Sequence, residues 1–186
     1  MPIAEVLQQA RQHMAKSVEH LQQQLARLRT GRATPALIEH IRVDYYGVPT
    51  PISQVGNISV PEPRMLVIQP WDRSLLGAIE KAILQSDLGV TPSNDGSVIR
   101  IVMPPLSEER RRELVKVCRK YAEEARIALR NLRREYMERL RQVEKEEHLS
   151  EDERRRGEQE LQKIMDSFTE EIERILERKE REILEE

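Results

Sequence analysis

Three stretches of this chain each carry a single stripe of apolar residues at helical spacing, and this feature restricts the possible folds most. In residues 1–32 the stripe consists of Ile3, Leu7, Ala10, Met14, Val18, Leu21, Leu25 and Leu28. In residues 107–143 it consists of Leu114, Cys118, Tyr121, Ala125, Leu129, Leu132, Tyr136, Leu140 and Val143. In residues 150–186 it consists of Leu161, Met165, Phe168, Ile172, Ile175 and Ile183. Helices with one apolar face bury it against one another, so we predict a slender bundle of helices about 27, 40 and 35 residues long.

Polar residues at the predicted helix starts support these boundaries. Ser107 precedes the second helix, where a side-chain oxygen can cap a backbone N–H. Ser150 and Glu153 form the S-x-x-E pattern of a capping box before the third helix. Gly157 lies near the start of that helix, where it weakens helix formation by about 1 kcal/mol relative to alanine.

The middle of the chain has a different character. Residues 33–106 contain nine of the ten prolines and five of the seven glycines. Short β-rich stretches end at these residues: "HIRVDYY" before Gly47, "NISV" before Pro61, "MLVIQ" before Pro70 and "VIRIVM" before Pro104. We expect one helix among them, from about Ser74 to Gln85, with Leu75, Ala78, Ile79, Ala82 and Ile83 on its inner face. The pattern predicts a small α/β domain over residues 31–105, inserted into a bundle formed by residues 1–30 and 106–186.

Two short connections, "RTGRATP" and "MPPLSEE", join the predicted domains. Gly31, beside Thr30, tolerates backbone conformations that other residues avoid. Pro104 and Pro105 restrict the return path, because the proline ring fixes φ. We interpret the pair of connections as a hinge.

Charge is segregated along the chain although the formal net charge is only −2. Residues 107–143 carry twelve Lys/Arg against seven Asp/Glu, whereas residues 150–186 carry eight against fourteen. The single cysteine excludes an intramolecular disulfide, and the N-terminal sequence lacks the order of a signal peptide. No segment approaches the length of a membrane span. We therefore expect a cytoplasmic protein without membrane contact.

Six arginines of the second predicted helix fall on one face. At about 100° per residue, five of them lie within about 40° of the sixth, Arg119. The set comprises Arg112, Arg119, Arg126, Arg130, Arg133 and Arg141. Glu123 is the acidic residue that falls among them. Such an arginine ridge can grip successive phosphates of a nucleic acid, because guanidinium binds each in a bidentate manner. Alternatively, these arginines form salt bridges with the acidic third helix.

Other chemistry finds little support in the sequence. The four histidines and Cys118 lack metal-ligand spacing, so we expect no metal and no cofactor. Cys118 lies on the apolar stripe and is expected to be a packed thiol. Tyr45 and Tyr46 could stack on a base, but adjacent strand residues face opposite sides, so we expect at least one to pack in the core. A coiled-coil adaptor explains the helices but not the inserted domain, and an enzyme requires a polar pocket that the sequence does not indicate.

Five sequence blocks resemble the ribosome recycling factors. They are "RTGRATP" at 29–35, "YYGVPTPI" at 45–52, "AIEKAILQSDLG" at 78–89, "GSVIRIVMPPLSEERRREL" at 96–114 and "AEEARIALRNLRRE" at 122–135. Together they cover the first connection, much of the inserted domain and most of the second helix. The third helix is assigned by its length and position rather than by a motif.

The resemblance implies an α+β fold: an elongated antiparallel three-helix bundle with an inserted β/α/β domain, L-shaped and tRNA-like in size. It implies a monomeric, non-enzymatic factor that binds the post-termination ribosome and, with elongation factor G, releases it from mRNA and splits the subunits. The bundle would contact RNA of the large subunit, and the small domain would meet the GTPase. On this basis the expected RNA-binding residues are Arg112, Arg119, Arg126, Arg130 and Arg133, joined by Arg29 and Arg32 from the first connection. For Arg29 and Arg32, simple capping of a helix C-terminus is an equally good explanation.

Overall fold

The computed structural model describes residues 2–184, which form two compact units. Of the described residues, one unit combines 2–25 with 113–184, and the other comprises Ala26–Arg112. The predicted domain boundaries at residues 30–31 and 105–106 lie within several residues of these limits and stay predictions.

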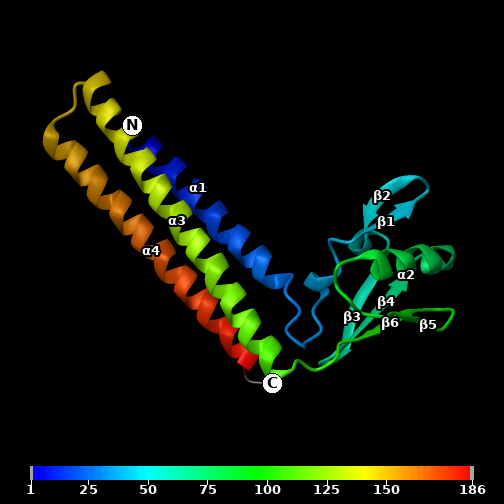
Figure 1. The fold of residues 1–186 in the computed structure, drawn as a ribbon. Helices are drawn as coiled ribbons and strands as arrows, with labels where there is room; N and C mark the ends of the chain where they lie inside the picture. Colours follow the sequence, from blue (N-terminus) through cyan, green and yellow to red (C-terminus); the bar gives the residue numbers. More distant parts are fainter. Residues whose placement is uncertain (1, 185–186) are drawn as a thin grey trace. The chain divides into compact units, whose positions relative to one another are not determined.

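Three long helices make up the first unit: α1 (Pro2–Ala26), α3 (Glu108–Glu146) and α4 (Glu151–Leu184). Their lengths of 25, 39 and 34 residues confirm the three predicted helices. α3 runs antiparallel to both α1 and α4 (Figure 1). The predicted serine caps are confirmed, because the Ser107 Oγ accepts the Arg110 N–H at 3.1 Å and the Ser150 Oγ accepts the Glu153 N–H at 3.1 Å, which is the serine half of the predicted capping box.

The apolar stripes form the core of the bundle. Fully buried side chains include Met14 and Leu21 of α1, Leu129 and Tyr136 of α3, and Ile172 of α4. Some stripe residues, such as Leu132 and Phe168, are only partly buried, because each helix turns part of its stripe toward the bundle edge. The prediction that the three stripes are buried together is confirmed.

Gly157 allows a close approach inside the bundle. A Cβ at this buried position would lie 3.2 Å from Ile3 Cγ2 and 3.4 Å from Leu140 Cδ2. Glycine therefore brings α4 near α1 and α3 at this level, and the resulting packing offsets its low helix propensity.

A polar cluster lies within the same bundle. The Tyr136 hydroxyl is hydrogen-bonded to His13 Nδ1 of α1, and the Arg139 guanidinium lies 4.8 Å from the centre of the Tyr136 ring. Arg139 Nη1 also donates to Gln9 Oε1 at 2.9 Å. The cluster joins α1 to α3 through side chains whose partners the sequence does not reveal.

The second unit has three layers (Figure 1). A ribbon of β1 (Arg42–Tyr45) and β2 (Val48–Pro51) forms the first layer, and α2 (Leu76–Gln85) forms the second. The third layer is a four-stranded antiparallel sheet in the order β3-β4-β6-β5. Its strands are β3 (Gly56–Glu62), β4 (Met65–Pro70), β5 (Ser93–Asn94) and β6 (Ile99–Val102).

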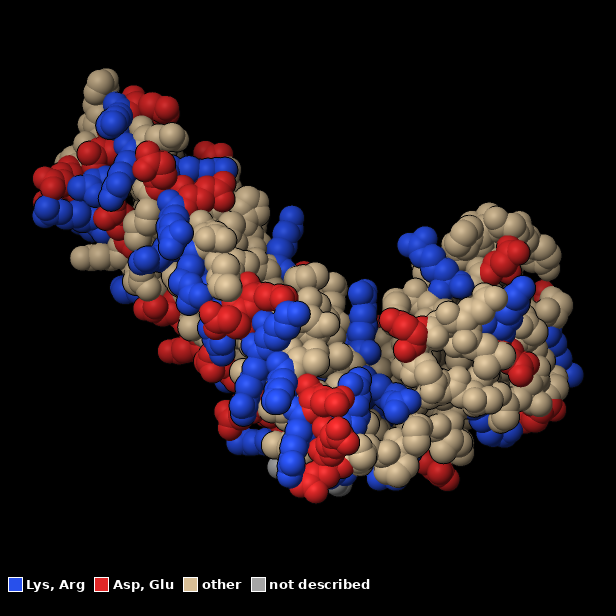
Figure 2. All heavy atoms as spheres, viewed as in Figure 1, with Lys and Arg blue, Asp and Glu red and all other residues tan. Residues whose placement is uncertain are grey.

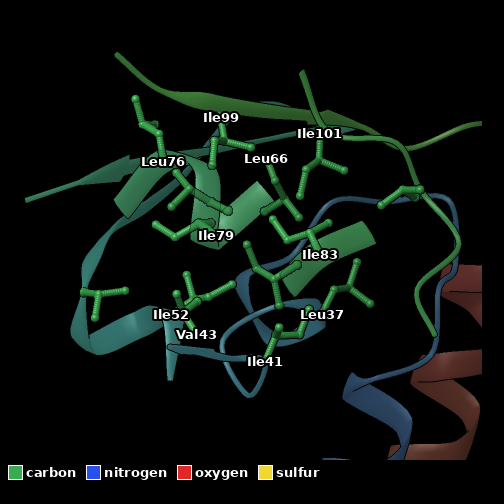
Figure 3. Packing of buried hydrophobic residues seen from close by; sticks show 14 of the residues in the cluster. Leu37, Ile41, Val43, Ile52, Leu66, Leu76, Ile79, Ile83, Ile99 and Ile101 are labelled. Atoms are coloured by element: carbon green, nitrogen blue, oxygen red, sulfur yellow. The ribbon is translucent and has the colours of Figure 1, made fainter. Parts of the chain in front are cut away.

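The core of this unit lies on both sides of α2. Ile79 and Ile83 pack among buried side chains of the sheet, such as Leu66 and Ile101, and of the ribbon, such as Val43 (Figure 3). The four predicted strands are confirmed. The predicted helix is also confirmed, although its first turn is the 3-10 helix Arg73–Leu75. β2 and β5 were not predicted, because β2 contains two prolines and β5 has only two residues.

The prediction that one of the two adjacent tyrosines packs in the core is wrong. Tyr45 is 39% exposed and Tyr46 is 77% exposed. Tyr46 is not a strand residue but the first residue of a two-residue turn, with φ of 49° followed by 84° at Gly47. The side chains of β1 alternate between the two faces only as far as Tyr45, and Val43 is the buried residue of this strand. Tyr46 lies in the turn beyond it and is therefore not directed into the core.

Candidate functional site: an arginine surface and a two-strand joint

Two arginines of the predicted ridge pair across the bundle with α4. Arg119 Nε lies 2.8 Å from Glu180 Oε1, and Arg126 Nη2 lies 2.5 Å from Glu173 Oε1. The cation is the less exposed partner in the Arg126 pair, with 25% of its side chain exposed, whereas the carboxylate Glu180 is the less exposed partner in the Arg119 pair, at 21%. These contacts are those of the salt-bridge alternative, which therefore accounts for the positions of Arg119 and Arg126.

Two further arginines pair within α3 itself. Arg130 Nη2 lies 2.9 Å from Glu123 Oε1, and Arg112 Nη2 lies 2.7 Å from Glu108 Oε1. Hydrogen bonds from Arg130 and then Arg126 lower the pKa of Glu123, so this carboxylate stays ionised among the arginines. Exposed pairs of this kind are weak and exchange readily for another anion.

Arg133 differs from the other four predicted contact arginines of α3. Its Nη1 donates at 2.9 Å to Gln162 Oε1, which is a neutral amide. Its Nε is buried and has no hydrogen-bond partner in the described chain. Within residues 2–184 no carboxylate pairs with Arg133. Its positive charge is therefore held in place by α4 but not neutralised there.

Basic and acidic side chains alternate over the visible face of the bundle (Figure 2). Toward the end of α3, Arg134 and Arg141 are exposed and make no ion pair with any described residue. The ridge thus has a paired part, from Arg112 to Arg130, and a part without carboxylate partners in the described chain, formed by Arg133 and Arg141.

The first connection follows the end of α1 at Ala26. Arg29 is half-buried and lies three residues beyond that end, outside the last helical turn. Thr30 is 1% exposed, and Gly31 has φ of 86°. Arg32 is exposed to solvent. The positive φ gives a structural reason for glycine at residue 31.

Both connections attach to the second unit at the β3–β4 turn. The Ala33 N–H donates at 2.7 Å to the carbonyl of Pro63, and the Met103 N–H donates at 2.7 Å to the carbonyl of Arg64. These bonds fix the chain at Ala33 on one side and at Met103 on the other. The predicted hinge residues Thr30, Gly31, Pro104 and Pro105 lie just outside the two fixed points.

The second unit carries exposed aromatic side chains, of which Trp71 was not predicted from the sequence. Trp71 is 71% exposed, and the neighbouring Asp72 accepts a 3.3 Å hydrogen bond from the Tyr46 hydroxyl. Hydrogen bonds from Ser74 lower the pKa of Asp72, and this carboxylate in turn raises the pKa of Tyr46. The Tyr46–Gly47 pair was the available sequence signal for the exposure of Tyr46, because such a pair is compatible with a two-residue hairpin turn.

The described part of the chain contains no candidate metal site. Among residues 2–184 there is no group of three or more His, Cys, Asp or Glu side chains able to hold a metal ion. Cys118 is buried, which raises the pKa of its thiol to about 11 and confirms it as a packed thiol. No helix in this range is long and apolar enough to span a membrane.

The fold and the charged surfaces define a class of protein: a three-helix bundle with arginines along one helix, interrupted by a three-layer α/β unit. A family model described as ribosome recycling factor matches residues 21–184. A ribosome-recycling factor of Carboxydothermus hydrogenoformans is 56% identical over 182 residues, covering 98% of each chain. One of Thermus thermophilus is 52% identical over 184 residues, covering 99% of this chain and all of the relative.

Solved structures give the same result. A solution structure of ribosome recycling factor has a TM-score of 0.81 at 46% identity and covers 100% of this chain and 99% of its own. A second structure has a TM-score of 0.70 at 52% identity, covering 99% of this chain and 100% of its own. It represents the Thermus thermophilus factor and the Escherichia coli elongation factor G bound to the Escherichia coli post-termination complex. The chain belongs to the ribosome recycling factor family.

Proposed function

We propose that this protein is a cytoplasmic, monomeric ribosome recycling factor without enzymatic activity. It binds the ribosome after termination and, together with elongation factor G, releases it from mRNA and splits the subunits. The observation that carries the proposal is the full-length similarity to a factor represented with elongation factor G on the post-termination complex.

In the proposed mechanism the bundle holds RNA of the large subunit through its arginine ridge. Arg133 and Arg130 are the principal contacts, because the first has no carboxylate partner in the described chain and the second has an exposed, exchangeable one. Arg112, Arg119 and Arg126 add contacts by exchanging their glutamate partners for phosphates, and Arg29 and Arg32 extend the surface at the joint. The second unit meets the GTPase, and residues 30–31 and 104–105 act as the hinge.

The experiment that tests this function is subunit splitting followed by light scattering. Purified protein, elongation factor G and GTP are mixed with post-termination ribosomes, and the signal should fall only when all components are present. Co-sedimentation with large subunits measures binding separately. A protein that neither co-sediments with ribosomes nor changes the scattering signal would contradict the proposal.

A further inference from the structure

The ribbon layer of the second unit leaves a groove beside β1. The groove has a volume of 760 Å³. Arg42 and Asp44 of β1 line one wall, and the α2 side chains Ala78, Lys81, Ala82 and Gln85 line the other. All of these residues belong to one compact unit. The ribbon has only two strands, so one long side of β1 has no neighbouring strand.

The backbone of β1 is unpaired on that side. The register pairs Tyr45 with Val48 across the two-residue turn, and such a pair exchanges hydrogen bonds. Because bonding alternates along an antiparallel ladder, the N–H and C=O groups of Arg42 and Asp44 point away from β2. No backbone hydrogen bond outside the ribbon involves these two residues in the described chain. β1 therefore presents a short strand edge able to accept another strand.

The helix provides a shallow floor for such a strand. On α2, Ala78 and Ala82 lie about 100° round the helix from the buried Ile79 and Ile83. Both alanines are only partly buried, and their methyl groups leave room above the helix. A strand added to β1 would therefore cover an apolar strip that the two-stranded ribbon leaves open.

Charge in the groove favours acidic side chains on the added strand. Arg42 and Lys81 are exposed, and neither has a hydrogen bond or ion pair with any described residue. The Asp44 carboxylate already accepts the Gly47 N–H at 2.7 Å. Asp87 is the second carboxylate that lines the groove, and neither Arg42 nor Lys81 forms an ion pair with it.

We propose that β1 binds an extended, acidic polypeptide segment of a partner protein as a third strand of the ribbon. The backbone of the segment pairs with Arg42 and Asp44, its small or apolar side chains cover Ala78 and Ala82, and its carboxylates lie near Arg42 and Lys81. This is strand addition, in which backbone bonds supply affinity and side-chain contacts supply selectivity. The site is additional to the proposed RNA and GTPase contacts.

The test uses the full chain and a short blocked peptide of alternating valine and glutamate residues. Amide hydrogen exchange is followed by NMR as peptide is added. At saturation, exchange of the Arg42 and Asp44 amides should slow by about tenfold, the factor expected for one net hydrogen bond each. The same peptide with N-methyl groups on alternate residues should give no slowing, because it lacks the ladder donors. A valine–lysine peptide should bind more weakly.

A matched pair of variants separates backbone pairing from charge. Arg42→Ala removes the charge but keeps the outward N–H, and should weaken peptide binding a few-fold. Arg42→Pro also removes the N–H, which makes no bond within the ribbon, and should weaken binding by about a further tenfold. Equal binding by the two variants, or by the N-methylated peptide, would overturn the proposal. Binding of a short oligouridylate in place of the peptide would also overturn it, since phosphates would then be the ligand of Arg42 and Lys81.

Discussion

Replacing Arg133 by glutamine tests whether the ridge binds RNA or only holds the bundle together. Arg133 contacts α4 through one hydrogen bond to the neutral Gln162 and pairs with no carboxylate among residues 2–184. Glutamine removes the charge while keeping a polar side chain near Gln162. The matched control is Arg126→Gln, because Arg126 pairs with both Glu173 and Glu123 and is 25% exposed.

RNA binding and bundle packing by Arg133 predict different changes in ribosome affinity and in protein stability. If Arg133 contacts a phosphate, one charge-assisted hydrogen bond of about 1.5–3 kcal/mol is lost, which corresponds to a decrease in affinity of about 10- to 100-fold. The slope of log K against log salt should also become shallower by about 0.9 for one duplex phosphate. Stability should change by less than about 1.5 kcal/mol, because only a bond to a neutral partner is removed.

Arg126→Gln should give the opposite balance. It removes a cation shared by two carboxylates, so the bundle should lose about 1 kcal/mol of stability and affinity should fall less than for Arg133→Gln. Both variants are measured by co-sedimentation with large subunits over a range of salt, and by thermal unfolding. If Arg133→Gln lowers the unfolding temperature while leaving affinity and salt slope unchanged, Arg133 is a packing residue and the RNA-binding interpretation fails.

Three further predictions concern the joint, the core and the α3–α4 turn. Gly31→Ala should slow subunit splitting but leave ribosome binding nearly unchanged, because a Cβ at φ of 86° costs about 1–2 kcal/mol. Gly89→Ala is the matched control, since Gly89 also has a positive φ, 71°, with open space around its Cβ, but lies outside the joint. The Gly89→Ala protein should split subunits at the normal rate. Cys118 should resist thiol reagents at pH 8 in the folded protein, because its thiol is buried and has a pKa of about 11. Since the ordinary pKa of the thiol is 9.0, the unfolded chain ionises first, and the free energy of unfolding should fall as the pH rises from about 9 to 11. Chemical denaturation at several pH values measures this loss. His148→Gly should raise the unfolding free energy by about 0.5–1 kcal/mol, since His148 lies in the turn two residues beyond the end of α3 and has φ of 53°. An unchanged or lower value would contradict the idea that this residue is strained.

The long helices could be predicted from sequence because their determinants are local. Apolar spacing and the serines before α3 and α4 specify each helix without reference to its neighbours. The structure of the ribbon depends instead on contacts between strands and on one turn. β2 is held by its register with β1 and not by β propensity, and Tyr46 is exposed because a turn with positive φ interrupts the strand.

The pairing of the arginine ridge could not be predicted, although its alignment could. The angular positions follow from α3 alone, whereas pairing depends on how α4 is placed against α3 along the bundle. Arg119 meets Glu180, which is 61 residues away in the chain. Arg133 meets Gln162 instead of one of the many glutamates of α4. A shift of α4 by one turn would exchange these partners, so packing rather than composition decides which arginine keeps its charge available.

The two fixed points of the second unit limit how the proposed hinge can move. Ala33 and Met103 donate to the carbonyls of the adjacent residues Pro63 and Arg64, so both connections move with one turn of the sheet. Dihedral change must then occur before Ala33 on one side and after Met103 on the other. The first side contains Gly31, which can adopt a wide range of φ, while the second contains two prolines whose φ is nearly fixed. Rotation concentrated in one connection, with the other acting as a stiff tether, gives a restricted swing. In the proposed mechanism, load from the second unit would pass through this tether to α3, which begins at Glu108, only a few residues beyond Pro105.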